Sequence, residues 1–130
     1  MFRNGCIELA TSDPHAGCEK PLLRGKWIVY SFTQAIANNI RCLHALGVDA
    51  PYVFSLSFVG VKGYMFSNGD RASMRRPVVL NEDVLIIPDI FIEEADAELK
   101  KILKPTFDIL WNAFGFEECG FYDDNEKLVE

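Results

Sequence analysis

A segment in the first half of the chain, SFTQAIANNIRCLHALG (residues 31–47), has the apolar spacing of an amphipathic helix. Its large apolar side chains recur every three or four residues, at Phe32, Ile36, Ile40, Leu43 and Leu46. Side chains at that spacing share one face of an α-helix. Ser31 can cap the amino end, and Gly47 can take the left-handed conformation that ends a helix. The pattern predicts a helix over about residues 31–46 that needs an apolar surface to pack against.

The next segment, YVFSLSFV (residues 52–59), alternates as a strand does. One side carries Tyr52, Phe54, Leu56 and Phe58, and the other carries Val53, Ser55, Ser57 and Val59. Successive side chains of a strand point to opposite faces of a sheet. We therefore expect the aromatic side to face the core.

Four other segments carry weaker strand patterns. Residues 5–10 (GCIELA) read as a short strand, and residues 26–30 (KWIVY) read either as a strand or as the lead-in to the helix. Residues 61–67 (VKGYMFS) read as a continuation of the 52–59 strand through a bulge at Gly60. Residues 75–96 read as one or two strands with a turn at 81–83, and Pro88 favours an edge strand or a bulge there.

A second helical stripe lies in DAELKKILKPTFDILWNAFG (residues 96–115). Its apolar face comprises Leu99, Leu103, Phe107, Leu110, Trp111 and Phe114. Pro105 predicts either a kink or the start of a new helix, because proline lacks the amide hydrogen that the preceding turn uses. Gly115 and Phe116 have the pattern of a carboxyl-terminal cap with an apolar contact.

Together these patterns predict an α/β fold of the α+β kind. We expect a mixed, mostly antiparallel sheet of four to six strands with two main helices packed on it. A length of 130 residues, 49% of them apolar, suits a single globular domain. Neither a membrane-spanning run nor a secretory signal is evident, so a cytoplasmic protein with reduced cysteines is expected.

Charge is distributed unevenly along the chain. Residues 1–76 carry nine Lys and Arg against five Asp and Glu, or +4, whereas residues 77–130 carry four against fourteen, or −10. The acidic half disfavours a polyanionic partner, so tight nucleic-acid binding is not expected. The basic half is compatible with a modest anion-binding or self-association surface, and the plain interpretation of the acids is that they solvate a helix and the C-terminal tail.

The stretch SLSFVGVKGYMFSNGDRASMRRPVVL (residues 55–80) contains three glycines and three arginines. A phosphate-binding loop needs GxxxxGK followed by Ser or Thr, and Lys62 here lies between Gly60 and Gly63 with strand-forming residues after it. Asn68-Gly69 is instead a favoured pair for a two-residue hairpin turn. The order of residues therefore favours a β-hairpin over a phosphate loop.

The arginines near this hairpin are the candidate ligand-binding residues. Arg71, Arg75 and Arg76, with Lys62 and the ring of Tyr64, can form an anion site through guanidinium hydrogen bonds. The alternative is solvated loop charge or pairing with the acidic helix.

Metal and catalytic sites have little support. His15 and Cys18 form half of a possible zinc site, with Cys6, Cys42 and His44 as conceivable completions, but structural zinc sites usually combine two close pairs. Asp83, Asp89, Glu93 and Glu94 can hold a divalent ion or act as a carboxylate pair, although acids are common in turns and ahead of helices. We expect no catalytic residue, no metal and no cofactor.

Several segments in order resemble a known protein region. FRNGCIELA, LHALGVDAPYVFSLSFVGVKGYMF, DVLIIPDIFIEE and LKPTFDILWNAFGF are similar to the C-terminal region of bacterial proteins with an N-terminal Schlafen-type AlbA-like domain. Those proteins are described as DNA-binding or ATP-binding transcriptional regulators. The resemblance implies an accessory C-terminal domain, because the nucleotide and nucleic-acid functions belong to the AlbA-like domain. It carries over no catalytic residue.

Two functions of different classes follow as expectations. The first is a non-catalytic interaction or regulatory module that forms a homodimer or docks on an upstream AlbA-like domain, using an edge near Pro88 or the 60–76 hairpin. The second is a sensor of a small anionic ligand, with a pocket under the aromatic strand and the arginines of the 52–76 hairpin as anion donors. No membrane partner is expected.

Overall fold

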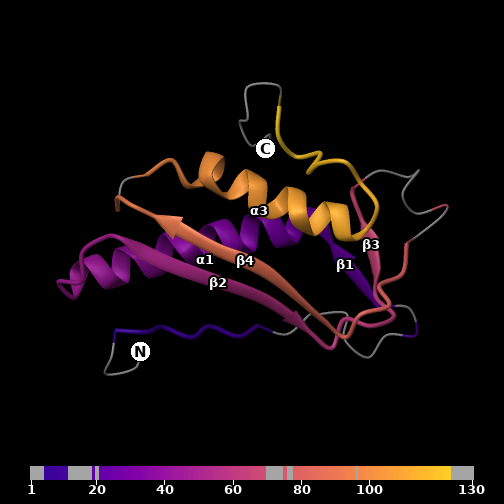
Figure 1. Cartoon of the computed structure of the whole chain (residues 1–130), viewed down its shortest axis with the longest axis horizontal. Coiled ribbons are helices and arrows are strands. Elements are labelled where there is room, and N and C mark those ends of the chain that lie inside the picture. The colour runs from indigo at the N-terminus through magenta and orange to yellow at the C-terminus, as the bar shows by residue number, and fades with distance from the viewer. Residues whose placement is uncertain are drawn as a thin grey trace.

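A computed structural model describes residues 5–11, 19, 21–69, 75, 78–95 and 97–123 of the protein, and among these residues it gives two main helices and four strands. In chain order the elements are β1 (Leu22–Arg24), α1 (Gly25–Ala45), β2 (Tyr52–Val59), β3 (Met65–Ser67), β4 (Val84–Ile92) and α3 (Leu99–Ala113), as drawn in Figure 1. The mixed α and β composition predicted from the sequence is confirmed.

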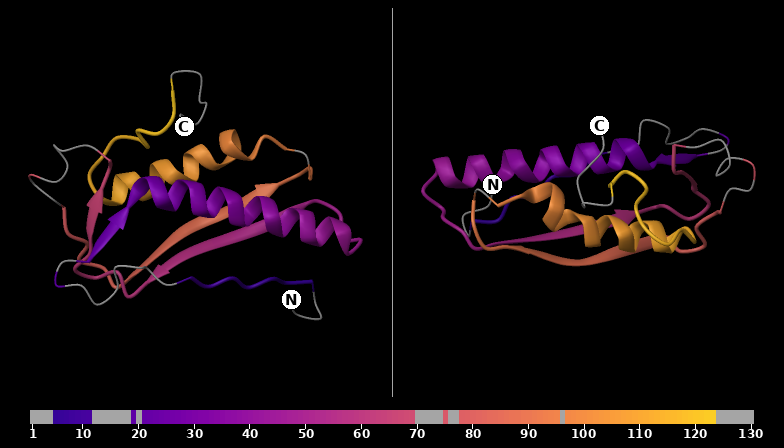
Figure 2. Two further views of the ribbon diagram at one scale, coloured as in Figure 1. Left: turned by 180° about the vertical axis from the view of Figure 1, so that it is seen from behind. Right: turned by 90° about the horizontal axis from the view of Figure 1, so that it is seen from above.

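The longest strands form an antiparallel ribbon. β2 pairs with β4, from Tyr52 opposite Ile92 to Val59 opposite Val84. The aromatic side of β2 faces the core, as the alternation predicts, and α1 and α3 pack on that inner face (Figure 2). The rings of Phe32 on α1 and Phe58 on β2 meet edge to face, with centroids 5.6 Å apart.

A bulge divides β4 into two halves. Phe54 lies opposite Ile90 and Leu56 opposite Ile87, so two steps on β2 correspond to three on β4. The extra residue falls at Pro88 and Asp89, where the sequence predicts an edge strand or a bulge. Because Ile87 and Ile90 are three residues apart, they would face opposite sides of a regular strand. The bulge lets both be buried, at 1% and 5% exposure.

A second, smaller sheet joins distant parts of the chain. β1 and β3 pair in parallel, with Leu23 opposite Phe66, and Met65 also makes an antiparallel bridge to Val79. The four described strands lie within the predicted number, but they form two sheets of two strands each and not one sheet. Parallel pairing between strands so far apart leaves no mark in the local pattern.

The hairpin expected in residues 55–80 is also different. A two-residue turn at Asn68-Gly69 would place the residues directly after it opposite Met65, but Met65 pairs with Leu22 on one edge and makes its antiparallel bridge to Val79 on the other. The prediction of a tight turn there is wrong. Residues 61–67 do not continue β2, because the chain turns at 61–64, where the Tyr64 amide bonds to the Val61 carbonyl, and then enters the other sheet.

Both helices differ from their predicted bounds mainly at the amino end. α1 begins at Gly25, so residues 26–30 are helical and Ser31 is not its cap. Gly47 does follow the helix at φ +78°, as predicted. α3 runs through Pro105 as one element, and Gly115 at φ +82° ends it, with the Phe116 amide bonded to the Trp111 carbonyl.

Other sequence expectations concern the ends and the cysteines. Residues 5–11 run beside β2 but form no strand, so the strand expected at 5–10 is not found. Cys42 and Cys119 are free thiols. Neither described helix is long and apolar enough to cross a membrane.

Candidate interaction surface

The residues proposed for anion binding lie in different settings. Lys62 is exposed in the turn after β2, and Tyr64 is half-buried against the core at the end of that turn. Arg75 is exposed, while Arg71 and Arg76 lie outside the described residues. The anion site therefore stays a prediction.

The other candidates from the sequence are the possible metal-binding residues and the acids of β4 and its flanks. His15 and Cys18 lie outside the described residues, and among those described no three His, Cys, Asp or Glu side chains gather at a possible metal site. His44 pairs at 3.5 Å with Asp49, both exposed. Of the acids singled out in β4 and its flanks, Asp89 accepts a 2.6 Å hydrogen bond from the Ser55 hydroxyl.

A groove lies between α1, β2 and residues 5–11. Figures 1 and 2 show these residues running alongside β2, and two cavities of about 450 and 710 Å³ flank them. Phe32 and Leu56 line both cavities, and Phe58 and Tyr64 line the larger one. The described lining includes Glu8 but neither Lys nor Arg, so these walls do not themselves offer an anion site.

The other face of the β2–β4 ribbon is uncovered by the described residues, and we call it the outer face. Its apolar side chains are Val53 (57% exposed), Val59 (74%), Val84 (45%), Ile86 (74%) and Phe91 (67%). Isolated exposed apolar residues are normal, but clustered ones are typical of a binding surface. Cross-strand pairing gathers these side chains into two clusters, Val53 with Phe91 at one end and Val59 with Val84 at the other.

The outer face is apolar at both ends and polar in the middle. Ser55 on β2 faces the bulge of β4, where its hydroxyl bonds to Asp89. Ser57 lies opposite Ile86, between this pair and the end formed by Val59 and Val84. The bulge that buries Ile87 and Ile90 thus also places a carboxylate at the centre of the outer face.

Acidic residues flank both ends of the outer face. The exposed acids are Asp49, Glu93 and Glu94 at one end and Glu82 and Asp83 at the other. Lys62 is the only basic residue in the flanking segments 48–51, 60–63, 81–83 and 93–95, all of which the structure describes. The local potential of this surface is therefore negative.

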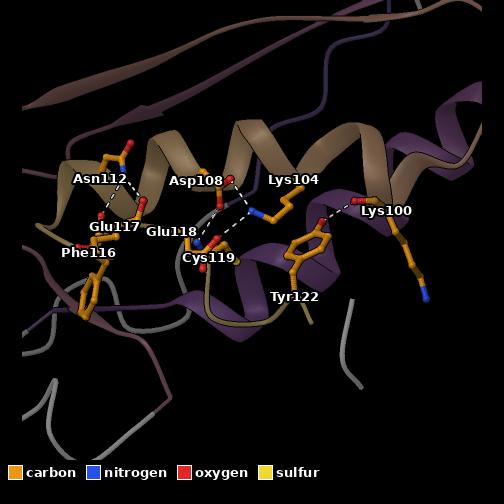
Figure 3. A network of polar contacts seen from close by, with 9 residues as sticks. All are labelled: Lys100, Lys104, Asp108, Asn112, Phe116, Glu117, Glu118, Cys119 and Tyr122. Carbon is orange, nitrogen blue, oxygen red and sulfur yellow. Dashed lines mark hydrogen bonds and ion pairs between the residues drawn. The ribbon is translucent and has the colours of Figure 1, made fainter. Parts of the chain in front are cut away.

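A polar network on α3 serves a structural role (Figure 3). Lys104 bonds to Asp108 at 2.8 Å and to Glu118 at 3.2 Å, and Asp108 accepts the Cys119 amide at 2.8 Å. The Tyr122 hydroxyl donates to the Lys100 carbonyl at 2.6 Å. These contacts hold the segment after α3 against the helix.

Burial opposes ionisation of the Cys119 thiol and the Tyr122 hydroxyl in this network. Burial raises the pKa of the Cys119 thiol to about 11, and burial also raises the pKa of Tyr122. The hydrogen bond to Asp108 raises the pKa of Lys104, against the opposing effect of burial. Since the thiolate is the reactive form of cysteine, Cys119 is not an activated nucleophile.

Sequence reasoning identified half of the outer face. The alternation of β2 places Val53, Ser55, Ser57 and Val59 together, as the structure confirms. The contribution of β4 was missed, because the bulge changes the phase of its alternation between Ile86 and Phe91. A proline followed by an acid within an apolar strand was the available signal.

Comparisons of the chain with protein-family models, with curated proteins and with solved structures find no match. The geometry of this chain and the sequence resemblance described above are therefore the basis for its proposed function.

Proposed function

We propose that this protein is a non-catalytic interaction module that binds a protein partner through the outer face of the β2–β4 ribbon. The observation that carries this proposal is the exposed apolar side chains clustered at both ends of that face, with Val59, Ile86 and Phe91 each more than 60% exposed. Exposed apolar patches of this kind mark interaction sites.

The exposed apolar side chains set how much free energy the outer face can contribute to binding. Complete burial of a Val, Ile or Phe side chain contributes roughly 1.5–3 kcal/mol, so covering Val59, Ile86 and Phe91 supplies about 5 kcal/mol. Association costs on the order of 4–15 kcal/mol in lost freedom of motion. The apolar contacts alone thus offset only the lower end of that cost, and the polar centre and acidic flanks decide which partner binds.

The resemblance to the C-terminal region of Schlafen-type AlbA-like proteins supports the same function. A domain in that position is expected to act on its neighbours and not on a substrate. We accordingly place this module in a bacterial transcriptional regulator, where its partner is another domain of the regulator or a second protein.

Site-specific photocrosslinking tests the proposal. A photoreactive p-benzoylphenylalanine replaces Ile86 or Phe91 on the outer face, and in the control it replaces Asn38, which is exposed on α1. We expect discrete adducts in native cells from positions 86 and 91 but not from 38, with the partner identified by mass spectrometry. Adducts that are absent, or equal at all three positions, contradict the proposal.

A second candidate function is a small-ligand sensor that uses the groove beside residues 5–11. Its two cavities lie within the size range of ligand sites, and the larger is bordered by Val61 and Tyr64 on either side of Lys62. A thermal-shift screen of anionic metabolites and nucleotides tests it. Stabilisation of the wild type that is lost in Lys62→Ala supports this function, and no stabilisation by any compound opposes it.

A further inference from the structure

We propose that the outer face accepts an amphipathic helix with basic residues from another polypeptide, and not a second copy of this chain. This inference rests on the proposed function and adds the chemistry of the partner. Three properties of the outer face support it: its dimensions, its central carboxylate and its acidic flanks.

The dimensions of the outer face match one helix. From Val53 to Val59 there are six residue steps, or about 20 Å at ~3.3 Å per residue. A helix spans that length in about 13 residues at ~1.5 Å each. Two paired strands lie ~4.8 Å apart, so one helix about 10 Å wide covers both.

The arrangement of side chains specifies where the helix needs apolar contacts. Val53 and Phe91 form one apolar end, and Val59 and Val84 form the other, with Ile86 beside the latter. A matching helix has apolar residues in both its first and its last turns on one face. Spacings of three, four and seven residues place such side chains in a row.

The carboxylate at the centre of the outer face favours a partner that has a hydrogen-bond donor at that point. Asp89 accepts one hydrogen bond from Ser55 and is exposed. A carboxylate has about four acceptor positions, so this side chain has capacity for a further donor. A Lys or Arg at the middle of the helix can pair with it, and a charged hydrogen bond of this kind is stronger than a neutral one.

The acidic residues that flank the outer face also favour a basic partner. Five exposed acids and one lysine border the two ends, so a basic partner gains attraction at both ends and an acidic partner is repelled. Such attraction depends on salt concentration, because the charges are exposed to solvent.

The same charges disfavour a second copy. A two-fold axis through the centre of the outer face would bring Asp89 opposite its symmetry mate, since symmetric pairing places like with like. It would also bring acidic flanks against acidic flanks. Like charges brought together at an interface cost several kcal/mol, comparable to what the apolar contacts supply.

Peptide binding to the whole chain tests this inference. The probes are three fluorescein-labelled synthetic peptides of about 15 residues, measured by fluorescence anisotropy at low and high salt. The first has leucines along one helical face and lysines elsewhere. The second has glutamates in place of the lysines. The third has the composition of the first, reordered so that the leucines surround the helix.

We expect the first peptide to bind most tightly and the Ile86→Ser/Phe91→Ser variant to lose at least about tenfold in affinity. Asp89→Asn should weaken binding about two- to fivefold and reduce its salt dependence, as loss of a partly exposed ion pair does. Glu117→Gln, which removes an exposed acid outside the outer face, is the matched control and should bind as the wild type does. Circular dichroism and urea midpoints establish that each variant is folded.

The results that would contradict the helix inference are distinguishable from those that would contradict the proposed function. Equal or tighter binding of the glutamate peptide contradicts the inference that the partner is basic. It does not contradict the proposed interaction through the outer face. Equal binding of the reordered peptide shows charge attraction alone and overturns the helix. Dimerisation in light scattering that Ile86→Ser/Phe91→Ser abolishes replaces the helix with a second copy. No binding by any peptide and no dimer overturns the inference, and the photocrosslinking experiment then decides the proposed function.

Discussion

The indole ring of Trp111 lies against the backbone of Gly25, so that a β-carbon at residue 25 would stand only 2.7 Å from its Cζ2 atom. The same β-carbon would lie 2.9 Å from the Phe66 ring. Trp111 and Phe66 are fully buried and stack edge to face, with centroids 4.8 Å apart. Glycine at the first position of α1 thus lets β3 and α3 approach the start of the helix.

Gly25→Ala should destabilise the protein, although alanine is the better helix former. At this first helical position alanine gains less than the ~1 kcal/mol of a helix interior, whereas overpacking against two rigid, buried rings costs roughly 1–3 kcal/mol. We expect a net loss of about 1 kcal/mol, measured by urea denaturation. In the control Gly47→Ala, no atom lies within 4 Å of the new β-carbon, so only the strain of φ +78° contributes. The readout is the free energy of unfolding, and a shift in the Trp fluorescence maximum does not replace it. A Gly25→Ala variant that is more stable than the wild type would contradict the packing described.

Asn68 should be needed as a hydrogen-bond acceptor. Its side-chain oxygen accepts the indole N–H of Trp111, and Asn68→Ala leaves that buried donor without this acceptor. Such a loss costs about 1–3 kcal/mol. Asn68→Asp retains an acceptor oxygen and should be less destabilising. Equal unfolding midpoints for the wild type and Asn68→Ala would show that the bond contributes nothing.

Stability should fall at alkaline pH because of Cys119. Burial raises its pKa from 9.0 to about 11, so the folded state holds the thiol proton more tightly than the unfolded state does. This contribution is complete below pH 9 and is lost as the pH rises to about 11. By pH 10 the loss is about 1 kcal/mol. Cys119→Ala should flatten the dependence of unfolding free energy on pH between 8 and 10, and an unchanged slope would refute this assignment.

The two acids bound to Lys104 should differ in importance. The Asp108 side chain is 25% exposed and also accepts the Cys119 amide, whereas Glu118 is 68% exposed. Asp108→Ala removes two contacts and should cost about 1–2 kcal/mol. Glu118→Gln should cost less than about 0.5 kcal/mol, as solvent-exposed ion pairs do. Chemical denaturation of both variants measures this order, and a reversed order would contradict the network in Figure 3.

Local periodicity predicted the parts of the fold that bury one continuous face. The stripe from Phe32 to Leu43 and the alternation of β2 both correspond to observed elements. The amino end of α1 could not be located in this way, because it begins at a glycine and Arg24 supplies no side-chain cap. Its reason is tertiary: only a residue without a β-carbon fits beside Trp111.

The pairing between strands was less predictable from the sequence than the helices and strands themselves. Nothing in LLR or MFS indicates that β1 and β3 lie side by side in parallel, since parallel neighbours are brought together by the elements between them. The outer face was partly predictable because β2 alternates regularly. Its β4 half was hidden by the bulge, and its central carboxylate was visible only as one acid among many.

The packing of Gly25, Phe66 and Trp111 has a consequence for synthesis on the ribosome. These residues come from the first, middle and last thirds of the described chain, and Phe121 also contacts Trp111. While the chain is still being made, α1 and the β2–β4 ribbon can emerge, but this cluster lacks its central ring until α3 has left the exit tunnel. A chain truncated before Trp111 is therefore expected to be a target for chaperones and proteases, however well its earlier segments form.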